Sequence, residues 1–209
     1  MDWLRRTERT PLPSAGASDE TAPGPVELAT PGIAALLEGV LEDRSHAVLD
    51  LGAAADSSLR VYTRFARRIR FADLLADGTL RLAWAAVLHA LPPQPERAYD
   101  LVFAWDILDR LFPEERPRLV ERLAEVTAPD ARLHVVVEAS ERARTQPLRF
   151  TLLDSDRMRC EPSGPARPAR WQLLPAEVER LLVPFRVVRA FTLKGGLREY
   201  VAVRGPPTA

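Results

Sequence analysis

Apolar residues along this chain alternate between short continuous runs and stretches in which they recur every three or four positions. A short continuous apolar run is typical of a strand that is buried on both faces of a sheet. Four segments are predicted to be such strands: 47–51, 68–72, 99–105 and 132–138. Two more apolar segments, 185–193 and 197–204, flank the turn Lys194-Gly195-Gly196 and predict an antiparallel hairpin near the C-terminus.

Helical periodicity fills most of the intervals between these strands. The first helix is predicted to begin at Thr30-Pro31, because threonine caps helices well and proline suits the first helical position. The apolar residues of its core face are Ile33, Leu36, Leu37, Val40 and Leu41. Further helices are predicted at 57–67, 114–126 and 175–182.

Two long segments have weaker patterns. Residues 74–98 are ambiguous, since helical periodicity over 80–91 is followed by three prolines that end a helix. Residues 140–170 are expected to be irregular, apart from a strand near 149–153. This second segment has more arginines than acidic residues, which suits a lid, a substrate loop or a surface for a protein partner. It lacks interleaved aromatic residues, so nucleic-acid binding is not expected.

The N-terminal residues differ in composition from the rest of the chain. Residues 7–29 are rich in Pro, Ala, Ser, Thr and Gly and carry few large apolar groups. Such a segment buries too little apolar surface to offset its ordering entropy, so residues 1–29 are predicted to be a flexible arm. Trp3 and Leu4 would give this arm a small anchor for packing or for a protein partner. Residues 30–209 are predicted to form one domain.

The order of strands and helices predicts an α/β fold of the Rossmann-like kind, with a mainly parallel sheet flanked by helices and a C-terminal antiparallel hairpin. In such folds, ligands bind beyond the carboxyl ends of the strands. The residues at those ends are Gly52, Asp73, Trp105-Asp106 and Glu138. These positions are therefore the first candidates for a functional site.

Composition narrows the possible functions. The formal net charge is zero, so no overall field attracts nucleic acid or a membrane surface. Cys160 is the single cysteine, which excludes an intrachain disulfide and a cysteine-based zinc site. No apolar run is long enough to span a bilayer, and the first residues lack the apolar region of a signal peptide. A cytoplasmic location is expected, and no metal site is.

The turn after the first of these strands is the most informative local feature. Residues 47–58 read AVLDLGAAADSS, a strand, a turn containing one glycine, and the start of a helix. Asp73 follows 21 residues after Gly52, at the end of the next strand. An acidic side chain at that place can accept hydrogen bonds from both hydroxyls of a ribose. Alternatively, Asp73 is an ordinary turn residue.

The chain resembles the class I S-adenosylmethionine-dependent methyltransferases over about residues 32–204. The segments that carry the resemblance are VLDLG, RFAD, YDLVFAWDILDRLF with the helix and strand that follow it, and the terminal helix and hairpin from LLPAEVERLL onward. The resemblance implies S-adenosylmethionine as the cofactor. It also implies that Asp50 braces the turn, that Gly52 and Ala54 lie beside the cofactor, and that Asp73 binds its ribose.

The chain departs from this family at two positions of the turn. Ala54 and Asp56 stand where the family usually has its second and third glycines. Asp56 is predicted either to cap the helix that starts at Ser57 or to occupy a backbone conformation suited to glycine, with its carboxylate near the methionine end of the cofactor. In both cases we expect a lower affinity for the cofactor than a glycine would give.

Trp105 ends the predicted strand 99–105, and Asp106 follows it. Trp105 is expected to line the space for the cofactor or the substrate. Asp106 would orient or deprotonate a hydroxyl or amine of the acceptor, and is the candidate catalytic residue; the alternative is a cap for the turn at 107–111. Glu138 is a weaker candidate. Three other polar or aromatic residues are expected to pack in the core rather than react: Trp84, His89 and His134.

Two functions fit these observations. The first is methyl transfer from S-adenosylmethionine to a small molecule or a protein side chain. The second is a non-catalytic, methyltransferase-like subunit that binds a partner through the N-terminal arm or through residues 141–170. Asp73, Trp105 and Asp106 favour the enzyme, whereas Ala54 and Asp56 favour the non-catalytic subunit.

Overall fold

A six-stranded sheet forms the centre of the computed structural model, which describes the following residues: 24–74, 87, 90, 91, 98–139, 147–163 and 173–206. The strand order is β3-β2-β4-β5-β9-β8. The strands are β2 (His46–Asp50), β3 (Ala66–Phe71), β4 (Tyr99–Phe103), β5 (Thr127–Glu138), β8 (Phe185–Thr192) and β9 (Leu197–Arg204). The first four in this order are parallel, and β9 runs antiparallel to both β5 and β8. The predicted α/β fold with its terminal hairpin is confirmed.

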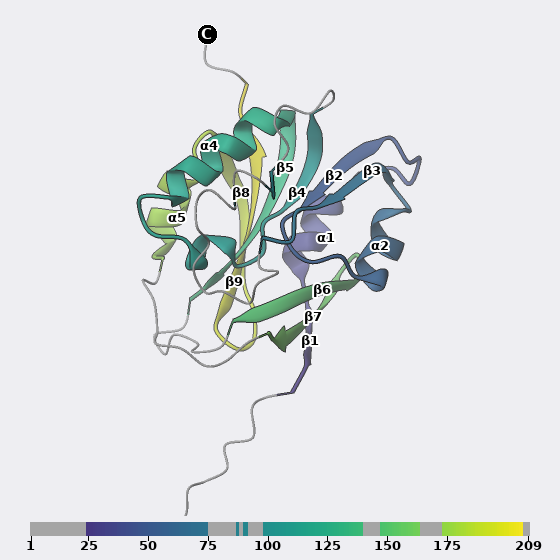
Figure 1. The fold of residues 1–209 in the computed structure, drawn as a ribbon, viewed down its shortest axis with the longest axis horizontal. Coiled ribbons are helices and arrows are strands. Elements are labelled where there is room, and N and C mark those ends of the chain that lie inside the picture. Colours follow the sequence, from purple (N-terminus) through teal and green to yellow (C-terminus); the bar gives the residue numbers. More distant parts are fainter. Residues whose placement is uncertain are drawn as a thin grey trace, which may run out of the picture.

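Helices cover both faces of this sheet (Figure 1). On one face lie α1 (Pro31–Leu37) and α2 (Asp56–Tyr62), and on the other lie α4 (Arg116–Val126) and α5 (Pro175–Leu181). A short 3-10 helix, η1 (Ile107–Arg110), follows β4. Alternate residues of each strand point to opposite faces, so the buried apolar side chains divide into two clusters, one beneath each pair of helices.

A second, three-stranded antiparallel sheet was not expected. Its strands are β1 (Val26–Ala29), β6 (Leu148–Asp154) and β7 (Arg157–Pro162), in the order β1-β7-β6. The prediction of an irregular segment at 140–170 is therefore wrong for most of the described residues, and the arm does not extend to residue 29. The missed signal is the alternation of large apolar residues in two short segments: Leu148, Phe150 and Leu152, then Met158 and Cys160.

These alternate side chains join the core cluster that lies under α1 and α2, so the small sheet packs against the same face of the molecule. In Figure 1 it lies below α1 and α2, beside the turn between β8 and β9. The backbone N–H of Leu152 donates to the Ser58 hydroxyl of α2 at 3.0 Å. The small sheet is thereby attached to the helix that follows the glycine-containing turn.

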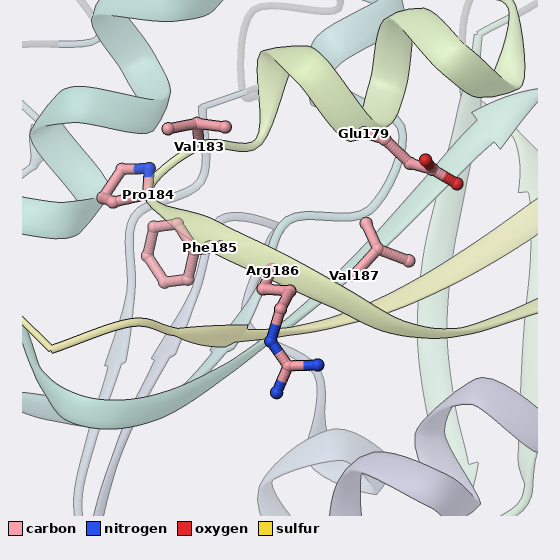
Figure 2. A pocket seen from close by; sticks show the side chains of 6 residues that line it. All are labelled: Glu179, Val183, Pro184, Phe185, Arg186 and Val187. Carbon is pink, nitrogen blue, oxygen red and sulfur yellow. The ribbon is translucent and has the colours of Figure 1, made fainter.

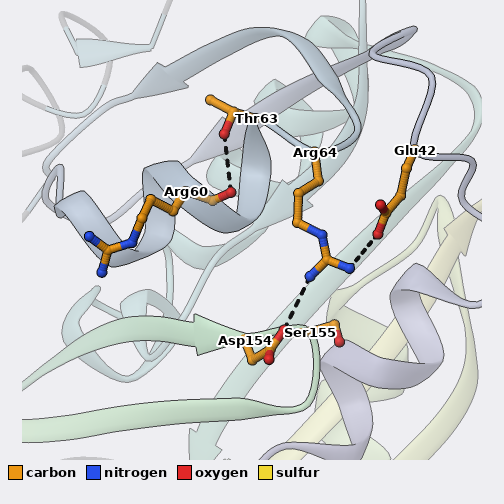
Figure 3. Close-up of polar contacts among 6 residues, drawn as sticks. All are labelled: Glu42, Arg60, Thr63, Arg64, Asp154 and Ser155. Carbon is orange, nitrogen blue, oxygen red and sulfur yellow. Dashed lines mark hydrogen bonds and ion pairs between the residues drawn. The ribbon is translucent and has the colours of Figure 1, made fainter.

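An arginine on the surface makes a further connection to the small sheet. The guanidinium of Arg64 pairs with Glu42, in the loop after α1, and with Asp154 at the end of β6, 3.2 Å away (Figure 3). Just before it, the Thr63 hydroxyl donates to the carbonyl of Arg60 and completes the last turn of α2. The ion pairs are exposed, so water screens them and they add little to stability. They serve to orient the small sheet more than to stabilise it.

Several helix ends differ from the prediction. Helix α1 ends at Leu37 because Gly39 has a φ of 74°, and Leu41, expected in the core, is 66% exposed. Helix α2 is shorter than expected because β3 begins at Ala66. No helix in the described part of the chain is long and apolar enough to cross a membrane.

The junction between α5 and β8 forms an open pocket of about 300 Å³. Figure 2 shows its lining: Glu179 from α5, Val183 and Pro184 from the connection, and Phe185, Arg186 and Val187 from β8. Phe185 pairs with Arg204, whose neighbour Val203 pairs with Arg132 in the first half of β5. This pocket therefore lies toward the amino end of β5, away from the predicted functional site.

Candidate functional site

The structure places Asp73 beside Gly52. After β2 and β3 end, their connecting loops stay hydrogen-bonded: the N–H of Asp73 donates to the carbonyl of Gly52 at 3.1 Å, and that of Leu74 to Leu51 at 3.0 Å. Asp73 has a φ of 42°, an uncommon conformation for a residue other than glycine. Its side chain is half-buried, and it makes no hydrogen bond or ion pair with the described residues. The two predicted cofactor positions are thus brought together.

Asp50 is buried beneath this turn and holds three donors. Its Oδ1 accepts from the backbone N–H of Gly52 at 2.8 Å and from the indole N–H of Trp105 at 2.6 Å, and its Oδ2 accepts from the Tyr62 hydroxyl at 2.7 Å. Burial raises the pKa of the Asp50 carboxyl to about 6, although the three hydrogen bonds oppose the shift. The expected contact between Asp50 and the turn is present. Tyr62, which supplies one of the donors, was not singled out from the sequence.

Trp105 lies in the interior, which differs from the open lining position that we expected. It is 2% exposed and has a φ of 43°. Its ring stacks on Phe150 of the small sheet, with the ring centroids 5.5 Å apart and the planes 6° from parallel. A methyl group added at Gly52 would come within 3.0 Å of its indole nitrogen. Trp105 therefore packs between the turn and the small sheet, and only a glycine fits at position 52 without a shift.

The rest of the turn has an ordinary backbone. No residue from Ala53 to Asp56 has a positive φ. Ala54 and Asp56 are exposed, Ala55 occupies the N-cap position of α2, and Asp56 is the first helical residue. Asp56 therefore neither caps the helix nor needs a backbone conformation suited to glycine, so both predictions about its local backbone structure are wrong. As an acidic residue in the first turn, Asp56 interacts favourably with the helix dipole.

Asp106 follows Trp105 and pairs with an arginine. Its Oδ2 lies 2.6 Å from the Nη2 of Arg110, which also donates to the carbonyl of Leu148 in the small sheet at 2.7 Å. Asp106 occupies the N-cap position of η1, but its side chain makes no capping hydrogen bond. Arg110 is 3% exposed, so this pair fixes Asp106 relative to the small sheet.

A second carboxyl, Asp109, lies close to Asp106 and was not predicted. Its Oδ2 accepts from the backbone N–H of Glu138 at 2.7 Å, which ties η1 to the end of β5. Burial, with a smaller contribution from the charges of Asp106 and Glu138, raises the pKa of the Asp109 carboxyl to about 7, although the hydrogen bond and the charge of Arg116 oppose this. A carboxyl with this pKa is partly protonated at neutral pH.

A buried polar cluster joins the two ends of the domain. Glu199 of β9, with no exposed surface, accepts hydrogen bonds from the Thr30 hydroxyl, from the N–H of Gly32 at 2.8 Å, and from Nε2 of His134 at 2.8 Å. Burial raises the pKa of Glu199, but the hydrogen bond and charge of His134 and the other donors outweigh it and lower the pKa overall. The core position predicted for His134 is confirmed, and the Thr30 side chain accepts from Ile33 as a helix cap.

Some predicted residues lie outside the part of the chain that the structure describes: Trp3, Leu4, Trp84 and His89. Among the described residues, no group of three or more His, Cys, Asp or Glu side chains is arranged to hold a metal ion. The groups that the structure brings to the carboxyl ends of β2, β3, β4 and β5 are Asp73 beside Gly52, and the carboxylates Asp106, Asp109 and Glu138 with Arg110.

No protein-family model and no curated protein matches the chain. Solved structures do share its fold. An S-adenosylmethionine-dependent methyltransferase from Mesorhizobium loti matches with a TM-score of 0.51 and 12% identity, covering 81% of this chain and 96% of that one. The [4+2]-cyclase SpnF matches with a TM-score of 0.52 and 14% identity, covering 84% and 81%.

A third structure is the 1,6-didemethyltoxoflavin-N1-methyltransferase of Burkholderia thailandensis, bound to 1,6-didemethyltoxoflavin and S-adenosylhomocysteine. It matches with a TM-score of 0.50 and 20% identity, covering 84% of this chain and 77% of that one. The chain therefore has the Rossmann-like fold of the class I S-adenosylmethionine-dependent methyltransferases. At these identities the likeness establishes the fold, and the activity has to be argued from the residues at the strand ends.

Proposed function

We propose that this protein transfers a methyl group from S-adenosylmethionine to a small-molecule acceptor. The observation that carries the proposal is the half-buried carboxylate of Asp73, held beside Gly52 at the adjacent ends of β2 and β3 with no hydrogen-bond partner among the described residues. A carboxylate in that position is suited to accept both hydroxyls of a ribose. The strain of a positive φ at Asp73 is consistent with a functional position.

The turn fits the cofactor in two further respects. Residues 52–55 are one glycine and three alanines, so no large side chain of the turn obstructs a bound molecule. Asp50 holds the N–H of Gly52, which fixes the start of the turn before a ligand binds. We assign ribose recognition to Asp73 and backbone contact to Gly52 and Ala54. Fixing these groups in advance reduces the entropy cost of binding.

When bound, S-adenosylmethionine would supply a methyl group on a positively charged sulfur; the acceptor forms the new bond to carbon, the sulfur keeps the electrons of the old one, and the proton of the acceptor passes to solvent water. We assign Asp106 to the acceptor. Its ion pair with Arg110 at 2.6 Å holds the carboxylate in place, which suits it to accept a hydrogen bond from a hydroxyl or amine N–H of the acceptor and to orient that group. Trp105 and Phe150 exclude water from the space beneath the turn.

A second candidate is a non-catalytic, methyltransferase-like subunit. The three hydrogen bonds that Asp50 accepts all come from residues of the protein, so the turn is held in place without a ligand. The exposed carboxylate of Asp56 lies at the start of α2, where it would repel the carboxylate of the cofactor. The cyclase among the structures of the same fold agrees with a function other than methyl transfer. This candidate predicts no binding of S-adenosylmethionine.

Isothermal titration calorimetry separates the two candidates. We expect S-adenosylmethionine to bind the native protein, and Asp73→Ala to weaken binding by at least about 100-fold, because two hydrogen bonds to an ionised group are lost, each contributing about 1.5–3 kcal/mol. Asp156→Ala is the control, since Asp156 is an exposed aspartate in the turn between β6 and β7. If the native protein shows no binding at millimolar cofactor, the non-catalytic candidate is correct. If Asp73→Ala binds as well as the native protein, the assigned site is wrong.

A further inference from the structure

A groove lies between the small sheet and the turn that connects β8 to β9. Its volume is about 250 Å³. The small sheet contributes apolar side chains, and the turn contributes Lys194 and Gly195. The lining residues from the small sheet are Val26, Leu28, Leu148, Cys160 and Pro162, together with Glu27 at the rim and Gly24 before β1. The groove is therefore apolar inside, with charged groups at its edge.

The groove lies at the same end of the main sheet as the candidate site. Leu197, just after the turn, pairs with Glu138 at the end of β5, and the N–H of Ala139 donates to the carbonyl of Gly196 at 2.7 Å. On the other side, the carbonyl of the lining residue Leu148 accepts from Arg110. Because Arg110 also pairs with Asp106, the groove and the proposed acceptor residue are joined through one buried guanidinium.

The charges at the rim favour an anion. Both carboxylate oxygens of Glu27 are occupied, one by Arg157 at 2.6 Å and the other by Arg159 at 2.9 Å. The hydrogen bond from Arg159 is the main cause of a lowered pKa at Glu27, so this residue stays ionised and paired. Lys194 is exposed and makes no ion pair with the described residues. Of the two charged residues that line the groove, Glu27 is thus neutralised by its arginines, and Lys194 is the charge that remains for a ligand.

Lys194 and Cys160 add a compositional observation. Lys194 is the only lysine of the chain, beside 28 arginines, and Cys160 is the single cysteine. Both line this groove, Cys160 as a 4%-exposed side chain in its wall and Lys194 at its mouth. A flexible ammonium on a four-carbon stem can follow an anionic group more freely than a planar guanidinium.

We propose that this groove binds the methyl acceptor, and that the acceptor is a small apolar molecule carrying an anionic group that pairs with Lys194. The inference rests on the proposed function, because the acceptor of a methyl transfer has to reach the strand ends where Asp106 lies. Its apolar body would contact Val26, Leu148 and the Cys160 side chain. Its anionic group would remain at the rim, where water screens the pair only partly.

Two fluorescent probes test the groove directly. The probes 8-anilinonaphthalene-1-sulfonate and N-phenyl-1-naphthylamine share an aromatic body, but only the first carries a sulfonate. We expect the native protein to bind the sulfonate probe more tightly. Lys194→Gln should weaken its binding about threefold, as for one exposed ion pair, and Lys194→Arg should restore most of the affinity. The neutral probe should bind all three proteins equally.

A variant that fills the groove gives the second arm of the test. Val26 is 48% exposed at the edge of the small sheet, so Val26→Trp can place a ring in the groove without disturbing the core. It should weaken both probes at least tenfold. Val188→Trp, at another exposed valine on an edge strand, is the matched control and should have no effect. Equal probe binding by native protein and Val26→Trp would overturn the inference, as would equal affinity of the native protein for the two probes.

The third arm asks whether the occupant is the acceptor. An acceptor and its cofactor occupy neighbouring sites, so saturating S-adenosylhomocysteine should leave the sulfonate probe bound. Displacement of the probe would place the groove within the cofactor site and overturn the acceptor assignment. Calorimetry of S-adenosylhomocysteine alone reports on the proposed function separately: if it does not bind, methyl transfer fails, whereas the probe titrations still decide whether the groove takes an apolar anion.

Discussion

Two aspartate carboxyls bind a proton more tightly in the folded chain than in the unfolded one. The pKa values of Asp50 and Asp109 rise to about 6 and about 7, from a reference value of 3.8. For each residue, the free energy of unfolding is highest at low pH, where the carboxyl is protonated in both the folded and the unfolded chain. It decreases as the pH rises from the unfolded pKa of 3.8 to the raised pKa of the folded chain, because only the unfolded chain then releases the proton. At neutral pH both residues therefore reduce the free energy of unfolding.

Asp109→Asn should remove this pH dependence at one site. The amide cannot ionise, so the stability of the variant relative to the native protein should increase by up to about 4 kcal/mol between pH 4 and pH 8. Urea denaturation at the two pH values measures the difference. Asp156→Asn, at an exposed aspartate, serves as the control. A constant difference between native protein and Asp109→Asn across this range would show that Asp109 ionises normally.

Asp56→Gly should have a small effect on the cofactor. Asp56 is exposed and has the backbone conformation of a helix, so a glycine there restores no needed freedom. The substitution therefore acts on cofactor binding only by removing one exposed negative charge. We expect the affinity for S-adenosylmethionine to increase less than about fivefold. Calorimetry at two salt concentrations checks this, because the gain should shrink as salt increases. A gain of a hundredfold would mean that the turn changes conformation when the cofactor binds.

At the scale of single elements, the cap of α1 has two functions. The Thr30 hydroxyl accepts from the N–H of Ile33 and donates to the buried Glu199. The N–H of Gly32 donates to the same carboxylate, and a methyl group at Gly32 would come within 2.8 Å of it. A seven-residue helix has little stability of its own, so α1 depends on this attachment to the sheet.

Thr30→Val should therefore destabilise the protein by about 2 kcal/mol, since it removes a helix cap and leaves a buried carboxylate with one donor fewer. Valine has nearly the same volume as threonine, so packing is kept. Thr151→Val, at a half-buried position of β6, is the control and should change stability by less than about 0.5 kcal/mol. Equal urea midpoints for Thr30→Val and the native protein would contradict the role given to Glu199.

Strand β1 gives a second prediction for an element. Four residue pairs join it to β7, and Leu28 packs against the core cluster. Deleting residues 1–29 should lower the melting temperature by about 5–10 °C, whereas deleting residues 1–23 should change it by less than about 2 °C. Leu28→Asp in the full chain tests the same contact without a new terminus. Equal melting temperatures for the two deletions would show that β1 contributes nothing to stability.

For the whole molecule, the sequence predicted the main sheet well, because continuous apolar runs and a glycine turn define β2, β4, β5 and the β8–β9 hairpin. It also predicted that Asp73 lies near Gly52, which follows from parallel strand order alone. The small sheet was missed because β1 pairs with β7, a strand far away in the sequence, and local patterns do not show which distant segments pair. The inward position of Trp105 could not be predicted either, since it depends on Phe150, which lies 45 residues further along.

The attachment of Thr30 to Glu199 also bears on how the protein is made. The two residues are 169 positions apart, so a ribosome adding roughly 5–20 residues per second needs on the order of 10–30 s to deliver the second after the first. Until then α1 lacks the Glu199 carboxylate that binds its first residues, and the edge of β5 that pairs with β9 is open. The contacts that close the main sheet therefore form only after β9 has been synthesised, and until then the emerging chain offers an unpaired apolar strand to chaperones.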